Sequence, residues 1–167
     1  MTCRRTRRRG GGWHDVQVGE PPDAEVEAVP HRSEWAADFE QMRAALVAAV
    51  GDVAISVEHI GSTAVPGLAA KPTIDILMVV ASRESFLGVL PRVVALGFDY
   101  RPQNSLVGSD DHLLLRKVVH GKRTHHLHVL RVGSPEIEEY RRFRDALLRD
   151  PALAADYQTR FGQSLPQ

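Results

Sequence analysis

Hydrophobic positions along the chain follow helical spacing first and strand spacing next, which predicts ordered structure after about residue 30. Apolar residues at helical intervals predict an amphipathic helix over about 33–50. Segments 53–60 and 73–80 are rich in β-branched residues and predict two strands. The second strand is apolar on both faces except at Asp75, so we expect it to be central in a sheet.

The rest of the chain predicts a helix, a hairpin and two closing helices. Segments 112–119 and 124–132 flank the compact turn HGKR and predict an antiparallel hairpin, and FDYRP predicts a short strand before it. Helical spacing appears between Ser82 and Gly97, over about 135–149, and after Asp150–Pro151. Because the hairpin is segregated from the helices, this order predicts an α+β fold with a mixed β-sheet.

Charge and composition divide the chain into a tail and one domain. Residues 1–30 are rich in glycine and proline outside any periodic pattern, so we expect a disordered or loosely attached basic tail, followed by a domain over 31–167. The formal net charge is zero, but five of the 21 basic residues are arginines within the first nine positions. The rest therefore carries 16 basic and 21 acidic residues, which argues against broad nucleic-acid binding.

Membrane and export classes receive no support from the sequence. No apolar stretch approaches the roughly 18–20 residues that span a bilayer, and no apolar segment of a signal peptide follows the arginines. Cys3 is the only cysteine, so there is no internal disulfide framework. These features fit a cytoplasmic protein without a membrane partner, and they leave the oligomeric state open.

A polar turn between the two predicted strands is the first candidate site. Gly61 lets the backbone approach a ligand, while Ser62 and Thr63 place hydroxyl and N–H groups at the start of a short helix, where anions bind. Asp75 follows on the next strand and points toward the same place, so it could hold a divalent cation that bridges to phosphates. The alternative is structural: the glycine turns, the serine caps a helix, and the aspartate satisfies backbone donors.

Histidines in the segment THHLHV form the second candidate. Side chains alternate along a strand, so His126 and His128 share one face and His125 points to the other. If the hairpin lies beside the Asp75 strand, two imidazoles and a carboxylate converge in a site for zinc or a transition metal. The same pair could bind phosphate or act as a general base, and the histidines could equally be half-polar fillers of an exposed sheet face.

Several flanking residues extend these hypotheses. Glu58 is the candidate for an additional acid ligand, and His59 for a hydrogen-bond partner behind the site. Lys71 and Arg123 could neutralise a phosphate, although both positions also suit ordinary surface cations. Arg144 lies within a packing stripe, and we expect it to tie a helix to a carboxylate of the sheet.

The segments EHIGSTAVPGLAAKPTIDI, THHLHV and FRDALLRDPALAADY resemble the GrpB-like family of the nucleotidyltransferase superfamily, over roughly residues 30–165. The resemblance implies the small nucleotidyltransferase fold, in which a Gly-Ser turn precedes a strand with two acids and a later strand adds a third. Gly61 and Ser62 match that turn, and Asp75 matches the first acid. Leu77 occupies the position of the second acid, and 124–132, the matching later strand, has no acid.

Two function classes follow from these residues. The first is a transferase-like enzyme that acts on a nucleotide or another phosphorylated or activated small molecule. In it, Asp75 binds a divalent cation (Mg²⁺, Mn²⁺ or Zn²⁺), Ser62 binds the phosphate, and His126 or His128 replaces the missing acids or acts as base. The second is a non-catalytic nucleotide-sensing or protein-interaction module, which Leu77 favours.

Overall fold

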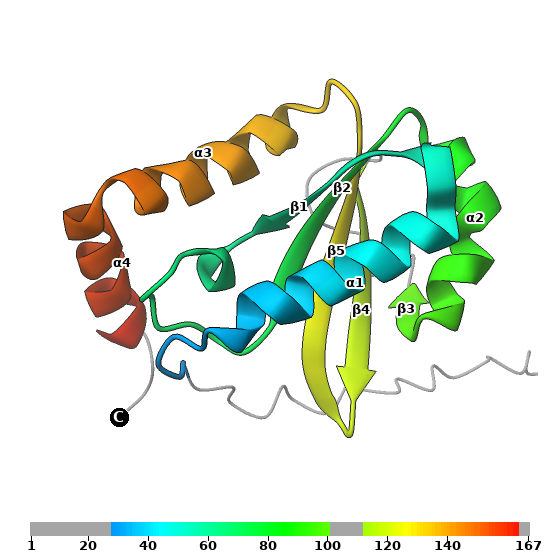
Figure 1. Cartoon of the computed structure of the whole chain (residues 1–167). Coiled ribbons are helices and arrows are strands. Elements are labelled where there is room, and N and C mark those ends of the chain that lie inside the picture. Colours follow the sequence, from blue (N-terminus) through cyan, green and yellow to red (C-terminus); the bar gives the residue numbers. More distant parts are fainter. Residues whose placement is uncertain (1–27, 101–111, 164–167) are drawn as a thin grey trace, which may run out of the picture.

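The computed structural model describes residues 28–100 and 112–163, and these form a mixed sheet with helices (Figure 1). The helices are α1 (Glu34–Val50), α2 (Arg83–Ala95), α3 (Pro135–Arg149) and α4 (Pro151–Gln163). The strands are β1 (Ala54–Ile60), β2 (Ile74–Val80), β3 (Phe98–Tyr100), β4 (His112–Val119) and β5 (Lys122–Arg131). Two 3₁₀ turns, η1 (Gly51–Val53) and η2 (Ser62–Ala64), complete the described elements.

The sheet confirms the predicted α+β class. Its strand order is β1-β2-β5-β4-β3, with β2 and β5 parallel and the other neighbouring pairs antiparallel. The strand with Asp75, β2, lies between β1 and β5, as its apolar character on both faces predicted. Parallel pairing between β2 and β5 places Asp75 directly opposite His126.

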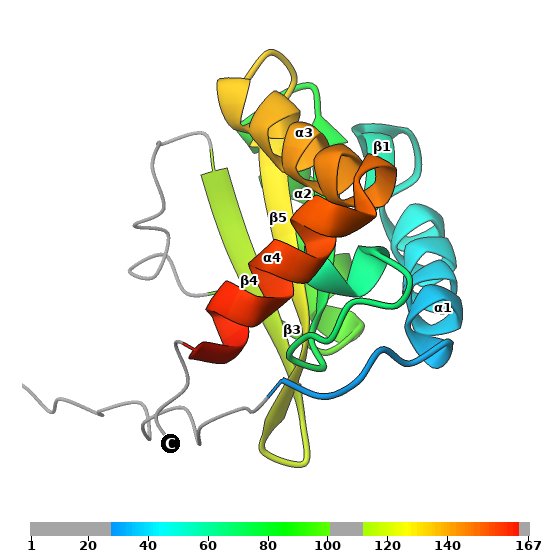
Figure 2. The same ribbon diagram turned by 90° about the vertical axis from the view of Figure 1, so that its left-hand side faces the viewer.

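The two faces of the sheet pack against different helices. Alternate residues of β2, from Ile74 to Val80, join the main core beneath α1 and α2, whose buried residues include Trp35 and Phe86. Leu77 and the other odd-numbered positions of β2 face α3, where Ile137 packs. Figure 1 shows α1 crossing in front of the sheet, with α3 and α4 beyond β1. Figure 2 shows α3 and α4 separated from α1. Asp75 shares the α3 face, because it lies two residues from Leu77.

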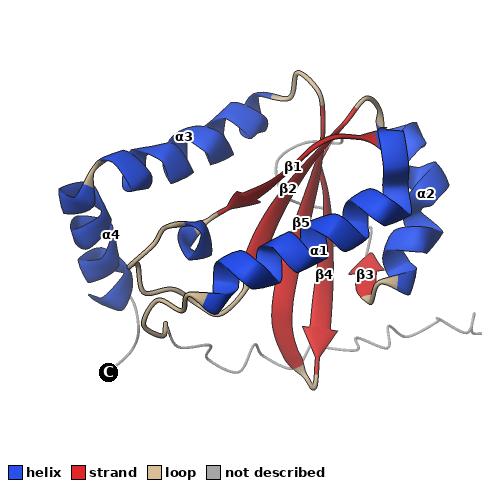
Figure 3. Cartoon of the chain, viewed as in Figure 1, coloured by secondary structure: helices blue, strands red, loops and turns tan. Residues whose placement is uncertain are grey.

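The β4–β5 hairpin extends beyond the helices at one end of the sheet (Figure 3). His120 and Gly121 connect the strands with φ values of 51° and 76°, the positive values of a type I′ hairpin turn. Past the turn the pairing shifts by one residue between Lys117 and Val118, because Thr124 has no counterpart on β4. This bulge decides which β4 side chains share a face with His128.

The first described residues already contact the domain. Val29 and Ala70 exchange two backbone hydrogen bonds of 2.9 and 3.0 Å. Contacts therefore begin two residues before the predicted boundary at 31, while residues 1–27 of the predicted tail lie outside the described part of the chain. Among the described residues, no helix has the length and apolar character needed to span a bilayer.

Candidate functional site

The backbone at Gly61 passes close to the carboxylate of Asp75. Gly61 has φ +73° and ψ −174°, a conformation open essentially to glycine alone. A Cβ built on Gly61 would lie 2.6 Å from Asp75 Oδ2, closer than real Cβ atoms approach. The backbone at this turn therefore packs directly against the aspartate, and the predicted approach of Gly61 to a ligand stays a prediction.

Three side chains converge at this point from two neighbouring strands. His126 Nδ1 lies 3.0 Å from Asp75 Oδ1, and His128 Nε2 lies 3.9 Å from the same oxygen. One potential ligand atom from each residue lies within 4.8 Å of the other two. Strand alternation predicted that His126 and His128 share a face, and the pairing of β5 with β2 meets the condition on which their convergence with Asp75 depended. Alternation also placed His125 on the opposite face, where its ring packs edge-on against Phe98.

The aspartate is held in its ionised form. Burial raises the pKa of Asp75, but hydrogen bonds and charge interactions with His126 and His128 outweigh it, so the pKa lies below its ordinary value. His126 Nε2 is buried and has no hydrogen-bond partner among the described residues. The ring nitrogen that faces Asp75 is Nδ1, so Nε2 lies on the other side of the ring.

Two further side chains support His128 from behind. Its Nδ1 lies 3.0 Å from His112 Nε2 and 3.2 Å from the hydroxyl of Tyr140. His112 comes from β4 and is only 2% exposed, while Tyr140 comes from α3. The sequence did not suggest either residue: the Tyr140 contact requires α3 to be docked, and the His112 contact depends on the hairpin bulge.

A cavity of about 190 Å³ opens beside Asp75 and His126. Its polar lining includes Ser62, Thr63, Lys71 and Thr73 as well, and Lys71 supplies a positive charge. Pockets that hold a whole drug-sized ligand measure about 300–1,000 Å³, so this cavity suits the charged end of a ligand. Lys71 is thus one of the residues around the cavity, and its role toward a phosphate stays a prediction.

The remaining predicted phosphate residues differ from one another: Ser62 lines the cavity, and Arg123 does not. Arg123 is absent from the cavity lining, and its carbonyl accepts a hydrogen bond of 3.4 Å from the Thr73 hydroxyl. The turn at Ser62 forms only the three-residue 3₁₀ turn η2, so it has no helix N-terminus to bind an anion. Ser62 Oγ instead lies 3.4 Å from the hydroxyl of Tyr157 on α4.

His59 contacts the turn at Thr63 from the face of the sheet that packs against α1. Thr63 is 3% exposed and its hydroxyl donates to the Thr73 carbonyl at 3.5 Å, while His59 Nε2 lies 2.9 Å from the same hydroxyl. Burial lowers the pKa of His59 to about 4, and its ring stacks on Phe39 with centroids 4.6 Å apart. His59 is therefore a neutral structural side chain behind the turn, as we expected for a residue that supports the site.

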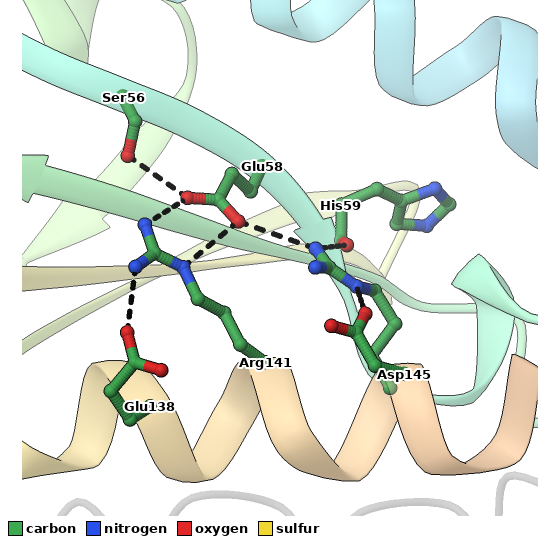
Figure 4. A network of polar contacts seen from close by, with 7 residues as sticks. Ser56, Glu58, His59, Glu138, Arg141 and Asp145 are labelled. Carbon is green, nitrogen blue, oxygen red and sulfur yellow. Dashed lines mark hydrogen bonds and ion pairs between the residues drawn. The ribbon is translucent and has the colours of Figure 1, made fainter.

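The structure does not bring Glu58 to the Asp75 cluster. Its carboxylate accepts hydrogen bonds from Arg141 at 2.6 and 3.3 Å and from Arg144 at 3.3 Å (Figure 4). Arg144 also donates to the His59 carbonyl at 3.2 Å, so it ties α3 to β1 as the sequence predicted. These arginines lower the pKa of Glu58, the Arg141 hydrogen bond contributing most, against the opposing effect of burial. Glu58 consequently serves the docking of α3.

We expect Glu58→Gln to lower the free energy of unfolding by about 1–2 kcal/mol at neutral pH, because two arginines lose a charged acceptor in a partly exposed network. The pKa of Glu58 lies below its ordinary value of 4.5 in the folded protein. Its stabilising effect is therefore present above pH 4.5 and is lost as the pH falls through the folded-state pKa. Urea unfolding of both proteins from about pH 7 down to about pH 3 tests this, because their free energies of unfolding should become equal as the pH falls.

Glu40→Gln is the matched control for that change. Glu40 pairs with Arg43 at 2.9 Å on the exposed surface of α1, so its loss should change stability by less than about 0.5 kcal/mol. Equal effects of the two substitutions, or a Glu58→Gln effect that persists at the acid end of the titration, would contradict the docking role of Glu58.

The family of the chain follows from its similarity to known proteins. The family described as GrpB protein matches residues 25–160. The chain belongs to the GrpB family. UPF0157 protein YqkA of Bacillus subtilis is 35% identical over 138 residues, which cover 81% of this chain and 38% of YqkA. The crystal structure of conserved protein GrpB from Enterococcus faecalis is 34% identical with a TM-score of 0.73, covering 80% of this chain and 79% of that one.

More distant matches include solved structures with a similar fold and a longer protein that contains a similar segment. A cytoplasmic RNA terminal U-transferase and the Cid1 poly(U) polymerase, the latter bound to MgATP, each match at a TM-score of 0.50 and 12% identity over 75% of this chain, covering 38% and 41% of theirs. This GrpB chain therefore has a nucleotidyltransferase-like fold. A dephospho-CoA kinase of Mycolicibacterium paratuberculosis is 30% identical over 165 residues, covering 86% of this chain and 40% of the kinase.

Proposed function

We propose that this GrpB protein binds the phosphorylated end of a small molecule or nucleotide beside a divalent cation and transfers a group to or from it. The observation that carries the proposal is the position of Asp75, which lies beside a histidine pair and lines a cavity together with Ser62, Thr73 and Lys71. A carboxylate on a central strand needs compensation, and the side chains that interact with this one are two imidazoles, which can themselves bind a metal.

Each side chain has a defined task in this proposal. Asp75, His126 and His128 hold the cation, which when bound supplies positive charge against phosphate oxygens. Lys71 adds a second positive charge at the cavity wall, and Ser62 and Thr73 offer hydroxyl groups to phosphate oxygens. The Cid1 match supports a nucleotide ligand, since that protein binds MgATP on a similar fold, and the dephospho-CoA kinase match adds coenzyme A precursors to the candidates.

A non-catalytic module that senses nucleotides or binds a protein is the second candidate function. Leu77 favours it, because this side chain is 0% exposed in an apolar cluster with Ile60, Val79 and Leu130. The position that holds the second acid in the superfamily therefore contributes to the core here. An enzyme and a nucleotide sensor both require the cavity to bind a ligand, whereas a protein-binding module does not, so ligand binding is the first property to measure.

We expect Asp75→Asn to change the free energy of unfolding of the ligand-free protein by less than about 1 kcal/mol or to raise it, because the asparagine oxygen can still accept the His126 hydrogen bond while the cost of burying a charge is removed. The same substitution should abolish stabilisation by cation and phosphorylated ligand. For the wild type, a ligand at a hundredfold excess over Kd stabilises by about 2.7 kcal/mol. Thermal unfolding with each cation, across nucleotides, dephospho-CoA and inorganic phosphate, measures both effects.

Asp52→Asn is the control, because Asp52 is an exposed carboxylate in η1. It should leave both the melting temperature and the ligand response unchanged. A large loss of stability in ligand-free Asp75→Asn, together with an intact ligand response, would make Asp75 a structural residue and remove the basis of the proposal.

A further inference from the structure

The cation site beside the cavity has an unusual donor set for the nucleotidyltransferase fold. Asp75 supplies the only carboxylate of the three converging residues, and His126 and His128 supply imidazole nitrogens. Mg²⁺ takes oxygen ligands in near-octahedral geometry, and one carboxylate with two imidazoles does not provide them. Imidazole nitrogen suits zinc and related transition-metal ions, and two histidines with one carboxylate are a recurrent set for such ions.

We infer that Asp75, His126 and His128 form a site for an imidazole-preferring transition-metal ion of the Zn²⁺ type instead of Mg²⁺, and that Tyr140 and His112 are positioning residues for it. The inference rests on the proposed function, because it names the cation of the same site. Such a site requires no second carboxylate, so the apolar side chain at Leu77 is compatible with it.

The two distances from Asp75 Oδ1 bracket those of a small tetrahedral ion, and all three donor atoms lie within 4.8 Å of one another. Bonds of about 2.0–2.2 Å at tetrahedral angles put neighbouring ligand atoms about 3.3–3.6 Å apart. The separations of 3.0 and 3.9 Å from Asp75 Oδ1 to the nitrogens of His126 and His128 lie on either side of that range. Binding of such an ion would draw the donors that are more than about 3.6 Å apart closer together by rotation of their side chains. Three protein ligands leave one position for water or a ligand atom, beside a cavity that Asp75 and His126 also line.

The contacts behind His128 provide what a metal-binding histidine needs. When one ring nitrogen binds a metal, the other carries a proton and donates it to a fixed acceptor, which orients the ring. The Nδ1 atom of His128, away from Asp75, lies within 3.2 Å of both the Tyr140 hydroxyl and His112 Nε2. His112 is buried and Tyr140 is partly buried, so both acceptors are held in place by packing.

Metal titration of the full chain tests the site without any phosphorylated ligand. The metal-stripped protein is titrated by calorimetry with Zn²⁺ and, separately, with Mg²⁺. We expect saturable Zn²⁺ binding that His126→Gln, His128→Gln and Asp75→Asn each abolish or weaken at least tenfold, and no comparable Mg²⁺ binding. His125→Gln is the matched control, since His125 lies on the same strand but on the opposite face, and it should retain wild-type affinity.

Tyr140→Phe tests the positioning role, with Tyr100→Phe as its control on the opposite face of the sheet. Loss of a hydrogen-bond partner behind a metal ligand typically weakens metal affinity by about 10–100-fold. We expect that loss in Tyr140→Phe, with the melting temperature of the metal-free protein unchanged and the visible absorption bands of bound Co²⁺ shifted. Wild-type affinity and an unchanged Co²⁺ spectrum in Tyr140→Phe would refute the positioning role.

The remaining outcomes separate the metal assignment from the proposed function. Mg²⁺ binding tighter than Zn²⁺, no saturable Zn²⁺ binding, or equal loss in His125→Gln and His128→Gln would each overturn the metal assignment. If a phosphorylated ligand then still stabilises the protein with Mg²⁺, the proposed function stands and only the inference fails. If Zn²⁺ binds as expected but no phosphorylated ligand does, the proposed function fails and the metal site stands.

Discussion

Replacing Leu77 with aspartate is expected to lower the free energy of unfolding by about 4 kcal/mol or more and to create no additional cation site. Leu77 is fully buried against Val79, Leu130 and Ile137, so the substitution both removes apolar packing and buries a carboxylate. Domains of this size are stable by only about 5–15 kcal/mol, so a large part of that stability would be lost. Urea unfolding followed by circular dichroism measures the effect.

Leu77→Ala separates the two contributions, because it removes the same packing without adding charge. It should cost about 2–5 kcal/mol, and Leu77→Asp should cost more. A Leu77→Asp protein with wild-type stability and new Mg²⁺ binding would show that this part of the α3 face opens onto the site. The superfamily's pair of acids would then be restorable in the GrpB fold by one substitution.

The second large effect is expected from Gly61→Ala. The new methyl group would lie 2.6 Å from Asp75 Oδ2 in a backbone conformation that alanine rarely adopts. Such strain costs about 1–3 kcal/mol, and relief requires the carboxylate to move. We therefore expect lower thermal stability together with loss of metal binding, measured by unfolding and by Zn²⁺ titration of the same protein.

Gly88→Ala is the control for that substitution, since Gly88 lies within α2 and an added Cβ there would meet no atom within 4 Å. Alanine in an exposed helix stabilises by up to about 1 kcal/mol relative to glycine, so the two identical changes should have opposite signs. If Gly61→Ala retained both stability and Zn²⁺ affinity, the close approach of the turn to Asp75 would have no role in the site.

Residues that follow a strict periodicity could be placed from the sequence. The apolar run around Asp75 identified a central strand, and alternation put His126 and His128 on one face with His125 on the other. The assignment of the histidines to faces depends on local geometry alone, whereas their convergence with Asp75 depends on one long-range pairing, β2 with β5, which the sequence left as a condition.

Residues whose position depends on tertiary docking were not predictable in the same way. Glu58 lies on the same face of the sheet as Asp75, but its role is decided by Arg141 and Arg144, which approach only when α3 packs on β1. Tyr140 reaches His128 through the same docking. The helix expected after Gly61 is only one 3₁₀ turn, since tertiary contacts override weak local propensity.

Thr124, which has no residue opposite it on β4, also affects how the sequences of related chains should be compared. If the pairing of Val119 with Lys122 continued without a shift, Leu113 would lie opposite His128, and His112 would point into the core beneath α1 and α2. A homologue could keep both histidines in an alignment and still lose their contact through a one-residue gap in the hairpin. Whether the number of residues between the two histidines is odd or even, together with the presence of the bulge, decides whether they share a face of the sheet. A score based on residue identity does not record this property.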